Sequence, residues 1–147
     1  MEMFAQRARE LVAQMTLEEK VSQMRYDAPA IERLGIPAYN WWNECLHGVG
    51  RSGTATVFPQ PIGMAASFDE SLMEHVAQAI SDEARAKYNQ YKTFGETGIY
   101  QGLTFWSPNI NLFRDPRWGR GHETYGEDPL LTGRMGTAFI RGLQEGK

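Results

Sequence analysis

Aromatic and charged side chains gather at three places in the sequence, and two of these places directly follow a short apolar run. Trp42 is followed closely by Glu44 and His47, and Trp106 ends a second apolar run. The segment 114–123, RDPRWGRGHE, is dense in charged and hydrogen-bonding side chains. Indole rings offer flat apolar faces that suit the C–H face of a pyranose ring, and carboxylates and guanidinium groups suit neighbouring hydroxyls. The three segments together have the composition of a saccharide pocket.

Each of these segments also has a structural interpretation. Paired tryptophans are more often part of a core than of a sugar platform, and the charged residues of 114–120 suit a salt-bridged loop that holds the fold. His47 is expected to be a buried histidine whose hydrogen bonds are satisfied, rather than a ligand. No group of His, Cys, Asp and Glu residues has the spacing of a metal site. We therefore expect neither a metal nor a cofactor.

A glycine-rich stretch raises a different hypothesis. Residues 48–53, GVGRSG, match the G-x-G-x-x-G pattern of dinucleotide-binding folds. That pattern must open a helix whose N-terminus meets the pyrophosphate. Pro59 and Pro61 follow within a few residues and prevent a regular helix where one is needed. The pattern therefore does not predict a nucleotide site.

The elements that must position these residues begin with two adjoining helices. Apolar residues recur through 4–15 with the period of an amphipathic helix. Thr16 and Glu19 then form a capping box, in which each side chain accepts a bond from the other residue's backbone amide. This capping box predicts a second, short helix over 17–24.

Two further helices are predicted later in the chain. Ser67 and Glu70 have the spacing of another capping box, ahead of a long helix with one apolar face. Asp128 is a predicted N-cap for a helix that begins at the proline beside it. This last helix is predicted to end at one of two glycines, Gly142 or Gly146.

Three short apolar runs lie between these helices, over 36–41, 62–66 and 103–106. Runs of this length bounded by proline or glycine are typical of buried strands. Strands that alternate with helices predict an α/β fold around a parallel sheet. About three strand–helix units fit in this chain, whereas a closed (β/α)8 barrel typically takes about 250 residues. If the fold is a barrel, it is therefore a truncated, partial one, and its open sheet edge and uncovered apolar face favour self-association.

Composition restricts the classes of partner. The 147 residues are 41% hydrophobic and 22% charged, with a formal net charge of −3, an ordinary balance for a globular domain. There is no basic stripe, so no nucleic-acid partner is expected. No apolar run approaches the roughly 20 residues that span a bilayer, so no membrane partner is expected. The first residues lack the pattern of a signal peptide, which favours a cytoplasmic location, with secretion after removal of a leader as the alternative.

Several longer sequence motifs occur along the chain in the order in which they occur in one family of enzymes. The segments that carry this likeness are 15–21 (MTLEEKV), 39–44 (YNWWNE), 46–48 (LHG), 58–60 (FPQ), 80–86 (ISDEARA), 105–111 (FWSPNIN), 114–121 (RDPRWGRG) and 123–129 (ETYGEDP). On these segments the chain resembles the N-terminal barrel region of glycoside hydrolase family 3, especially its β-xylosidase branch. The resemblance covers nearly the whole chain, so residues 1–147 are predicted to be the N-terminal portion of a catalytic barrel domain.

The resemblance implies a retaining exo-hydrolase that removes terminal non-reducing β-D-xylose residues from xylo-oligosaccharides. It implies that Glu44, Trp106 and Arg120 bind the terminal sugar and that Glu123 supports the arginine. His47, the histidine of the Glu-x-x-His motif that begins at Glu44, is assigned a supporting role as well. The family's nucleophile and its acid/base are expected beyond this chain, so no catalytic residue is predicted within it.

The resemblance also bears on sugar selection. Glucosidases of the family tend to carry the shorter aspartate at the position of Glu44, and a longer side chain fills the space of a glucose hydroxymethyl group. A xyloside is therefore the favoured substrate. Two alternatives stay open: a β-glucosidase of the same family, and a non-catalytic module that binds carbohydrate or another protein.

Overall fold

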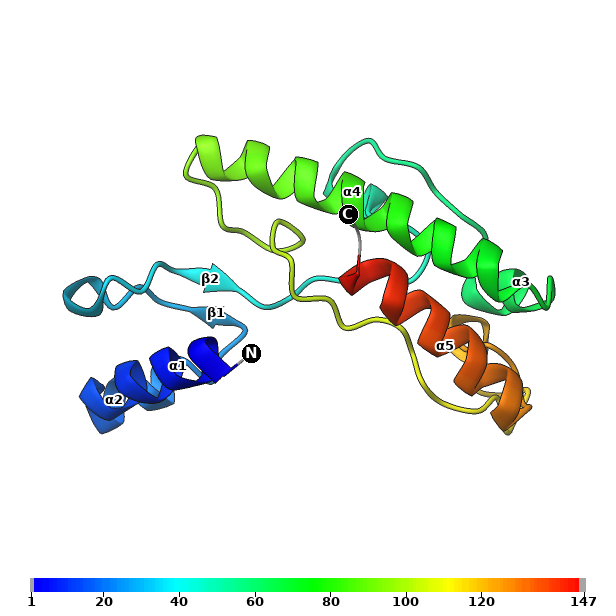
Figure 1. Ribbon diagram of the computed structural model, residues 1–147, viewed down its shortest axis with the longest axis horizontal. Coiled ribbons are helices and arrows are strands. Elements are labelled where there is room, and N and C mark those ends of the chain that lie inside the picture. The colour runs from blue at the N-terminus through cyan, green and yellow to red at the C-terminus, as the bar shows by residue number, and fades with distance from the viewer. Residues whose placement is uncertain (1, 146–147) are drawn as a thin grey trace.

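Helices alternate with long extended segments in the computed structural model, which describes residues 2–145 (Figure 1). The α-helices are α1 (Glu2–Gln14), α2 (Leu17–Ser22), α3 (Pro61–Ala65), α4 (Glu70–Thr93) and α5 (Pro129–Gln144). Short 3-10 helices are η1 (Glu32–Leu34), η2 (Gly50–Ser52) and η3 (Gly121–Glu123), and the strands are β1 (Asp27–Ala28) and β2 (Tyr39–Asn40). None of the helices among the described residues combines the length and apolar composition that a membrane crossing requires.

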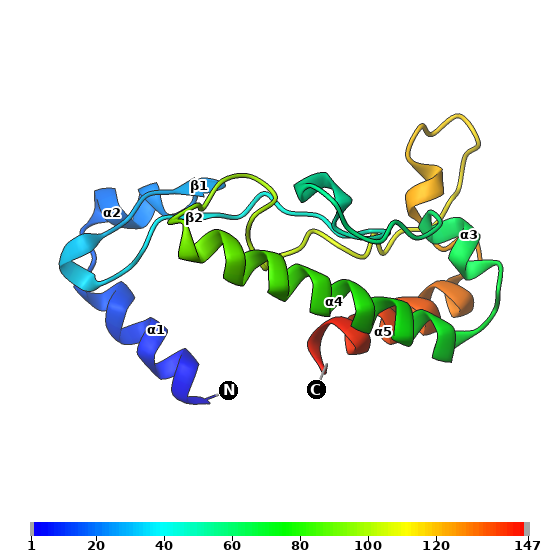
Figure 2. The same cartoon turned by 90° about the horizontal axis from the view of Figure 1, so that it is seen from above.

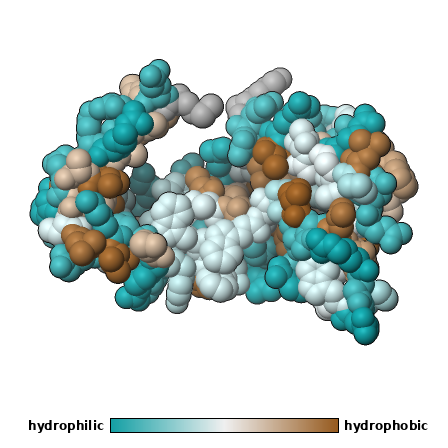
Figure 3. Space-filling model, turned by 90° about the horizontal axis from the view of Figure 1, so that it is seen from below, coloured by the Kyte–Doolittle hydropathy of each residue, from teal (hydrophilic) through white to brown (hydrophobic). Residues whose placement is uncertain are grey.

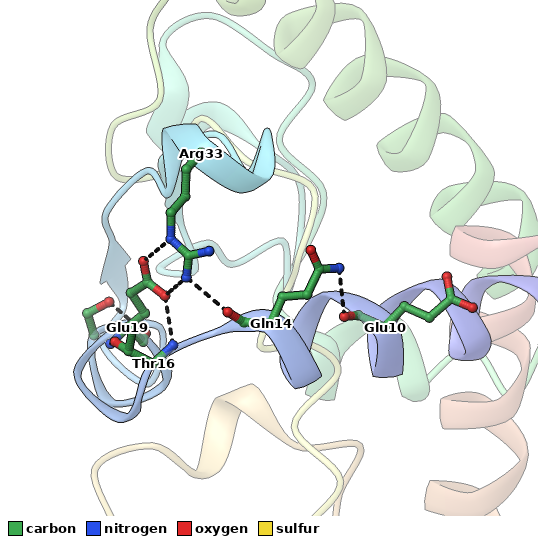
Figure 4. A network of polar contacts seen from close by, with 6 residues as sticks. Glu10, Gln14, Thr16, Glu19 and Arg33 are labelled. Carbon is green, nitrogen blue, oxygen red and sulfur yellow. Dashed lines mark hydrogen bonds and ion pairs between the residues drawn. The ribbon is translucent and has the colours of Figure 1, made fainter.

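Polar contacts hold the N-terminal corner together (Figure 4). The capping box is confirmed, since the Glu19 amide donates to Thr16 Oγ1 at 3.2 Å and the Thr16 amide donates to Glu19 Oε2 at 2.8 Å. Arg33 of η1 donates from Nε to Glu19 Oε1 at 2.9 Å and from a terminal nitrogen to the Gln14 carbonyl at 3.0 Å. This guanidinium ties the end of α1 to the start of α2.

The same corner buries little apolar surface. None of the residues of α1 is buried. Figure 3 shows brown, hydrophobic side chains at the surface on the left, over this corner, and again on the right. The large apolar side chains exposed on α1, on α2 and just beyond α2 are Met3, Phe4, Val12, Leu17, Val21 and Met24. The predicted amphipathic helix therefore forms, but nothing within the described residues covers its apolar side.

The helix α4 begins two residues later than a cap at Ser67 would require. Its N-cap is Asp69, whose side chain accepts from the Leu72 amide at 2.9 Å. The predicted capping box of Ser67 with Glu70 is therefore wrong. Ser67 Oγ instead donates to the Met64 carbonyl at 2.7 Å and accepts from the Asp69 amide at 3.2 Å. These bonds close the turn that follows α3, so the serine ends one helix and does not start the next.

The helix α5 begins as the sequence predicts and ends beyond Gly142, the first of the two predicted stops. Asp128 accepts from the Leu131 amide at 2.7 Å, and Pro129 occupies the first turn. The predicted stop at Gly142 is wrong, because the helix continues to Gln144, and Gly146 lies outside the described residues. Gly142 is buried against α4, where a Cβ atom would come within 2.5 Å of Ala77 Cβ. This glycine serves the close packing of two helices.

The core lies between α4 and α5 and the extended segments that run across them (Figures 1 and 2). Both views show the two helices side by side, and Figure 2 shows the extended segments as a separate layer. The helical layer contributes Met73, Ala77, Ile80, Ala84, Met135, Ala138 and Phe139. The segments around it contribute Cys45, Val49, Met64, Ala65 and Tyr125.

The three predicted strands have different outcomes. In 36–41 only β2 is a strand, and it pairs antiparallel with β1, with Asp27 opposite Asn40. The prediction for 62–66 is wrong, because this run is almost all within α3, which begins with Pro61. The run 103–106 is extended but belongs to no sheet among the described residues.

Side chains explain why 103–106 forms no regular ladder. This run lies beside 39–45, where the Trp106 amide donates to the Asn43 carbonyl at 3.0 Å. Other backbone groups are taken by side chains instead. Asn43 Oδ1 accepts from the Gly102 amide at 2.9 Å, and Tyr39 Oη accepts from the Leu103 amide at 2.7 Å. The described residues are therefore mostly helical with one small antiparallel sheet, and the parallel sheet of a partial barrel stays a prediction.

Candidate functional site

The five residues predicted to bind the sugar or to support its site lie around one broad hollow. Glu44, His47, Trp106, Arg120 and Glu123 all line it, and its volume is about 760 Å³. They come from three separate parts of the chain: the segment after β2, the extended run 103–107, and η3 with its N-cap. The other lining residues are Trp42, Asn43, Leu46, Gly48, Gly50, Arg51, Val57, Gln60, Tyr100 and His122.

Glu44 presents a carboxylate that is held at both oxygens. Oε2 accepts from the backbone amide of Leu46 at 3.1 Å. Oε1 lies 3.5 Å from Nε of Arg51, which comes from η2. The Glu44 side chain is 26% exposed. Each carboxylate oxygen has two lone pairs, so both keep capacity to accept from hydroxyl groups of a ligand.

His47 is fixed by bonds at both ring nitrogens. Nδ1 lies 2.9 Å from the Phe58 carbonyl oxygen, which can only accept, so Nδ1 carries the proton. Nε2 lies 3.3 Å from Nε2 of Gln60 and accepts from that amide. The prediction of a histidine with satisfied hydrogen bonds is therefore confirmed, although the ring is partly and not fully buried. It joins the segment after β2 to the chain just before α3.

Arg120 and Glu123 form a two-point ion pair at the rim of the hollow. Arg120 Nε donates to Glu123 Oε1 at 2.8 Å, and a terminal nitrogen of Arg120 bonds Oε2. Asn109 adds a longer contact to Oε2 at 3.5 Å. The hydrogen bond from Arg120 lowers the pKa of Glu123, with burial opposing it. Glu123 therefore stays ionised and orients the guanidinium of Arg120, whose side chain is 66% exposed.

Trp106 belongs to a row of exposed aromatic side chains. Its ring centre lies 5.2 Å from that of Trp42, at an interplanar angle of 39°. Trp42 in turn meets Tyr26 edge-on, with centres 5.4 Å apart. Trp106 is 61% exposed. The interpretation of the paired tryptophans as core residues is therefore wrong, because Trp41 and Trp42 are each 40% exposed. Trp42 and Trp106 both line the hollow and offer it apolar ring surface.

The arginine-rich loop divides into two parts. Asp115 and Arg117 bond each other, with Arg117 Nε donating to Asp115 Oδ1 at 2.9 Å, and neither residue lines the hollow. The salt bridge expected in this loop therefore forms between these two residues, which lie two positions apart. Arg120, three positions further on, turns toward the hollow instead. The sequence pattern alone does not separate the two behaviours, because both arginines pair with a nearby carboxylate.

Among the lining residues that the sequence analysis did not predict, Arg51 and Tyr100 contribute to the surroundings of Glu44. Arg51 lies in the glycine-rich stretch that was considered only as a nucleotide pattern, and in the structure this stretch forms the short turn η2. Tyr100 lies in a loop with no predicted element, and its ring sits under the guanidinium of Arg51 with 5.5 Å to the ring centre. The sequence signal that could have identified Arg51 was a positively charged residue a few positions after Glu44, in a glycine-rich turn that brings the chain back toward that glutamate.

Cys45, beside Glu44, faces away from this chemistry. It is fully buried, and burial raises the pKa of its thiol to about 12. Its backbone amide donates to Ser107 Oγ at 2.9 Å. The thiol is therefore a core group.

Comparison with curated proteins finds relatives that are named as xylosidases. A probable beta-D-xylosidase 7 of Arabidopsis thaliana is 52% identical over 148 residues, covering 94% of this chain and 18% of the relative. A xylan 1,4-beta-xylosidase of Xylanibacter ruminicola is 51% identical over 141 residues, covering 95% of this chain and 16% of the relative. The chain thus spans less than a fifth of the length of these relatives.

Solved structures and a family model agree with this likeness. A GH3 exo-beta-xylosidase in complex with a xylobiose aziridine probe superposes with a TM-score of 0.79 at 38% identity, covering 96% of this chain and 18% of that one. DesR, a beta-glucosidase from Streptomyces venezuelae in complex with D-glucose, superposes at 0.70 and 31% identity, covering 95% of this chain and 17% of that one. Residues 4–147 match the model described as "Glycosyl hydrolase family 3 N terminal domain". Because this match covers nearly the whole chain, the chain belongs to glycosyl hydrolase family 3, within its N-terminal domain.

Proposed function

We propose that the protein containing this chain is a retaining, exo-acting β-glycosidase that removes terminal β-D-xylose from xylo-oligosaccharides. In this proposal Glu44, Trp106 and Arg120 bind the terminal sugar, and Glu123 and His47 hold the site in shape. The observation that carries the proposal is the gathering of all five residues around one hollow. The names of the relatives that are 51% and 52% identical support xylose as the sugar.

The three sugar-facing residues have complementary chemistry. The Glu44 carboxylate accepts hydrogen bonds from hydroxyls. Arg120 uses two of its nitrogens on Glu123, and because a guanidinium has five N–H donors, others remain for sugar oxygens. The exposed indole of Trp106 provides a flat apolar surface for the C–H face of the ring. The site therefore combines an acceptor, a donor and a platform, as binding of a neutral polyol requires.

None of these contacts breaks a glycosidic bond. Retaining hydrolysis uses two carboxyl groups about 5 Å apart across the scissile bond, one as nucleophile and one as acid and base. In this proposal both belong to the remainder of the protein, and this chain supplies binding and orientation. The isolated chain is therefore expected to show no glycosidase activity.

We also infer that the segments on either side of α4 are the first strand–helix units of a (β/α)8 barrel. The runs 39–45 and 103–107 lie side by side with α4 between them in sequence, and α5 follows the second run and packs on α4. In such barrels the loops after the strands build the site. Glu44 and Trp106 lie near the C-terminal ends of the two runs, next to where such loops begin, which supports the inference.

A β-glucosidase is the second candidate, favoured by the superposition on a beta-glucosidase that holds D-glucose. Glu44 distinguishes the two candidates. A glutamate fills the space of a glucose hydroxymethyl group, so a xyloside fits better. Glu44→Asp keeps the charge but opens a gap of about one methylene, and discrimination at that scale is worth roughly 10- to 200-fold in relative kcat/KM.

The test uses the whole protein and paired 4-nitrophenyl β-D-xyloside and β-D-glucoside. The wild type is expected to prefer the xyloside, Glu44→Asp to reduce that preference, and Glu44→Ala to weaken both substrates because the partner of the hydroxyls is lost. A wild type that prefers the glucoside would overturn the assignment of xylose. An unchanged ratio in Glu44→Asp would show that another residue discriminates between the sugars.

A further inference from the structure

The carboxylate of Glu44 depends on a residue from a different segment for its orientation. Its own backbone neighbour Leu46 holds one oxygen, and Arg51 holds the other at 3.5 Å. We propose that Arg51 is a positioning residue, which directs the Glu44 carboxylate toward the sugar and thereby contributes to sugar selection. This inference rests on the proposed function, because it concerns the residue that orients Glu44 in the same hollow.

The turn that carries Arg51 is fastened to a long helix. The backbone carbonyl of Ser52 in η2 accepts from Lys87 Nζ at 2.9 Å and from Tyr91 Oη at 2.8 Å. Ser52 Oγ in turn donates to Tyr91 Oη at 2.8 Å. Lys87 and Tyr91 both belong to α4, which is part of the core. The backbone of Arg51 is therefore placed by a rigid element, although η2 itself is a single turn.

The side chain of Arg51 is held as well. Nη1 donates to Tyr100 Oη at 3.3 Å, and the guanidinium lies over the Tyr100 ring with its central carbon 5.5 Å from the ring centre. The Tyr100 amide donates to the Trp42 carbonyl at 2.9 Å, which anchors the tyrosine next to the hollow. A planar guanidinium can bond a hydroxyl, stack on a ring and reach a carboxylate at the same time, which an ammonium group cannot.

Stability alone does not account for this arrangement. The Arg51 side chain is 65% exposed, and exposed ion pairs contribute little to the stability of a fold. The contact instead restricts a flexible glutamate side chain to one direction. Restricting a binding group before the substrate arrives lowers the entropic cost of binding. The effect of Arg51 must then pass through Glu44.

A double-mutant cycle on the whole protein tests this dependence, with kcat and KM measured on the xyloside and the glucoside. Arg51→Ala is expected to lower kcat/KM on the xyloside about tenfold when Glu44 is present, and less than about twofold in a Glu44→Ala background. The ratio of the two substrates should move toward the glucoside with Arg51→Ala. Arg51→Lys keeps the charge but loses the stack, so it should restore only a small part of the lost activity.

The matched control is Arg25→Ala, which removes an equally exposed arginine, 67% exposed, from its ion pair with Asp27 outside the hollow. It should leave kcat/KM within about twofold of the wild type. Equal losses from Arg51→Ala in both backgrounds would overturn the proposal, because the arginine would then act independently of Glu44. If Arg51→Ala misfolds, Arg51→Lys provides the same cycle.

The outcomes also separate the two proposals. A wild type that cleaves a glucoside but not the xyloside refutes xylose as the substrate, while the coupling of Arg51 with Glu44 is still measured on the glucoside. A protein that cleaves neither substrate refutes both, since Arg51 would then orient Glu44 for no sugar.

Discussion

Three glycines of α5 provide a test of the packing that supports the site. Gly142 is buried against α4, where an added Cβ would lie 2.5 Å from Ala77 Cβ and 3.0 Å from the Gln78 backbone nitrogen. At Gly136 the same atom would meet the tip of the Ile110 side chain at 2.5 Å. At Gly133 nothing lies within 4 Å. The three positions therefore share one helix and one chemical change but differ in what surrounds it.

The magnitudes follow from these surroundings. An unhindered glycine-to-alanine change in a helix stabilises by about 0.5–1 kcal/mol, because it reduces the entropy of the unfolded chain. Gly133→Ala should show this gain. Gly142→Ala should lose about 1–3 kcal/mol, because the new methyl group meets backbone atoms of α4 that cannot move aside. Gly136→Ala should fall between them, since an exposed isoleucine tip can rotate away.

Urea unfolding of the chain, followed by far-ultraviolet circular dichroism, measures these differences as shifts of the midpoint at a constant slope. The expected order of stability is Gly133→Ala above wild type and Gly142→Ala below it. A Gly142→Ala chain as stable as Gly133→Ala would refute the close contact between α4 and α5. A change in slope for one variant would instead point to a change in the unfolded or native ensemble.

Three further predictions concern a thiol, a carboxylate and an exposed face. Cys45 is fully buried, and burial raises the pKa of its thiol from 9.0 to about 12. The folded chain should therefore not react with a disulfide reagent at pH 8 until urea unfolds it. Because the thiol pKa is higher in the folded state, the stability that this group contributes should fall as pH rises from 9 toward 12. The pKa of Glu123 is lowered below its ordinary 4.5, so its contribution to stability is present above that value and should be lost as pH falls through the lowered pKa, a loss that Glu123→Gln removes. The isolated chain should associate as its concentration rises, because Phe4, Leu17 and Met24 are exposed; sedimentation of a monomer at all concentrations would contradict this.

Helix starts that depend on near neighbours were predictable from the sequence. The capping box of Thr16 with Glu19 and the N-cap Asp128 form as predicted, because each uses residues three positions apart. Ser67 shows the limit of such patterns. A left-handed Phe68, with φ of 53°, places Asp69 instead of Ser67 at the cap, and only the turn after α3 determines that conformation.

Apolar runs were more ambiguous, because periodicity does not separate a short strand from a buried helical turn. The run 62–66 is almost all within the helix α3, and 103–106 is extended beside 39–45, with part of its hydrogen bonding supplied by Asn43 and Tyr39. A strand is defined by the segment with which it pairs. The local sequence of these two runs does not show which segment lies beside each of them after folding.

For the site, residue types and family likeness pointed to Glu44, Trp106 and Arg120 before any geometry was considered. Their common position around one hollow required the tertiary structure, because they lie up to 76 positions apart in the sequence. Arg51 is the clearest case of what the tertiary structure alone decided. Its proposed role depends on Lys87 and Tyr91 of α4, which lie more than 30 positions further along the chain. No local pattern records that contact, since folding brings the partners together only when α4 packs against the turn.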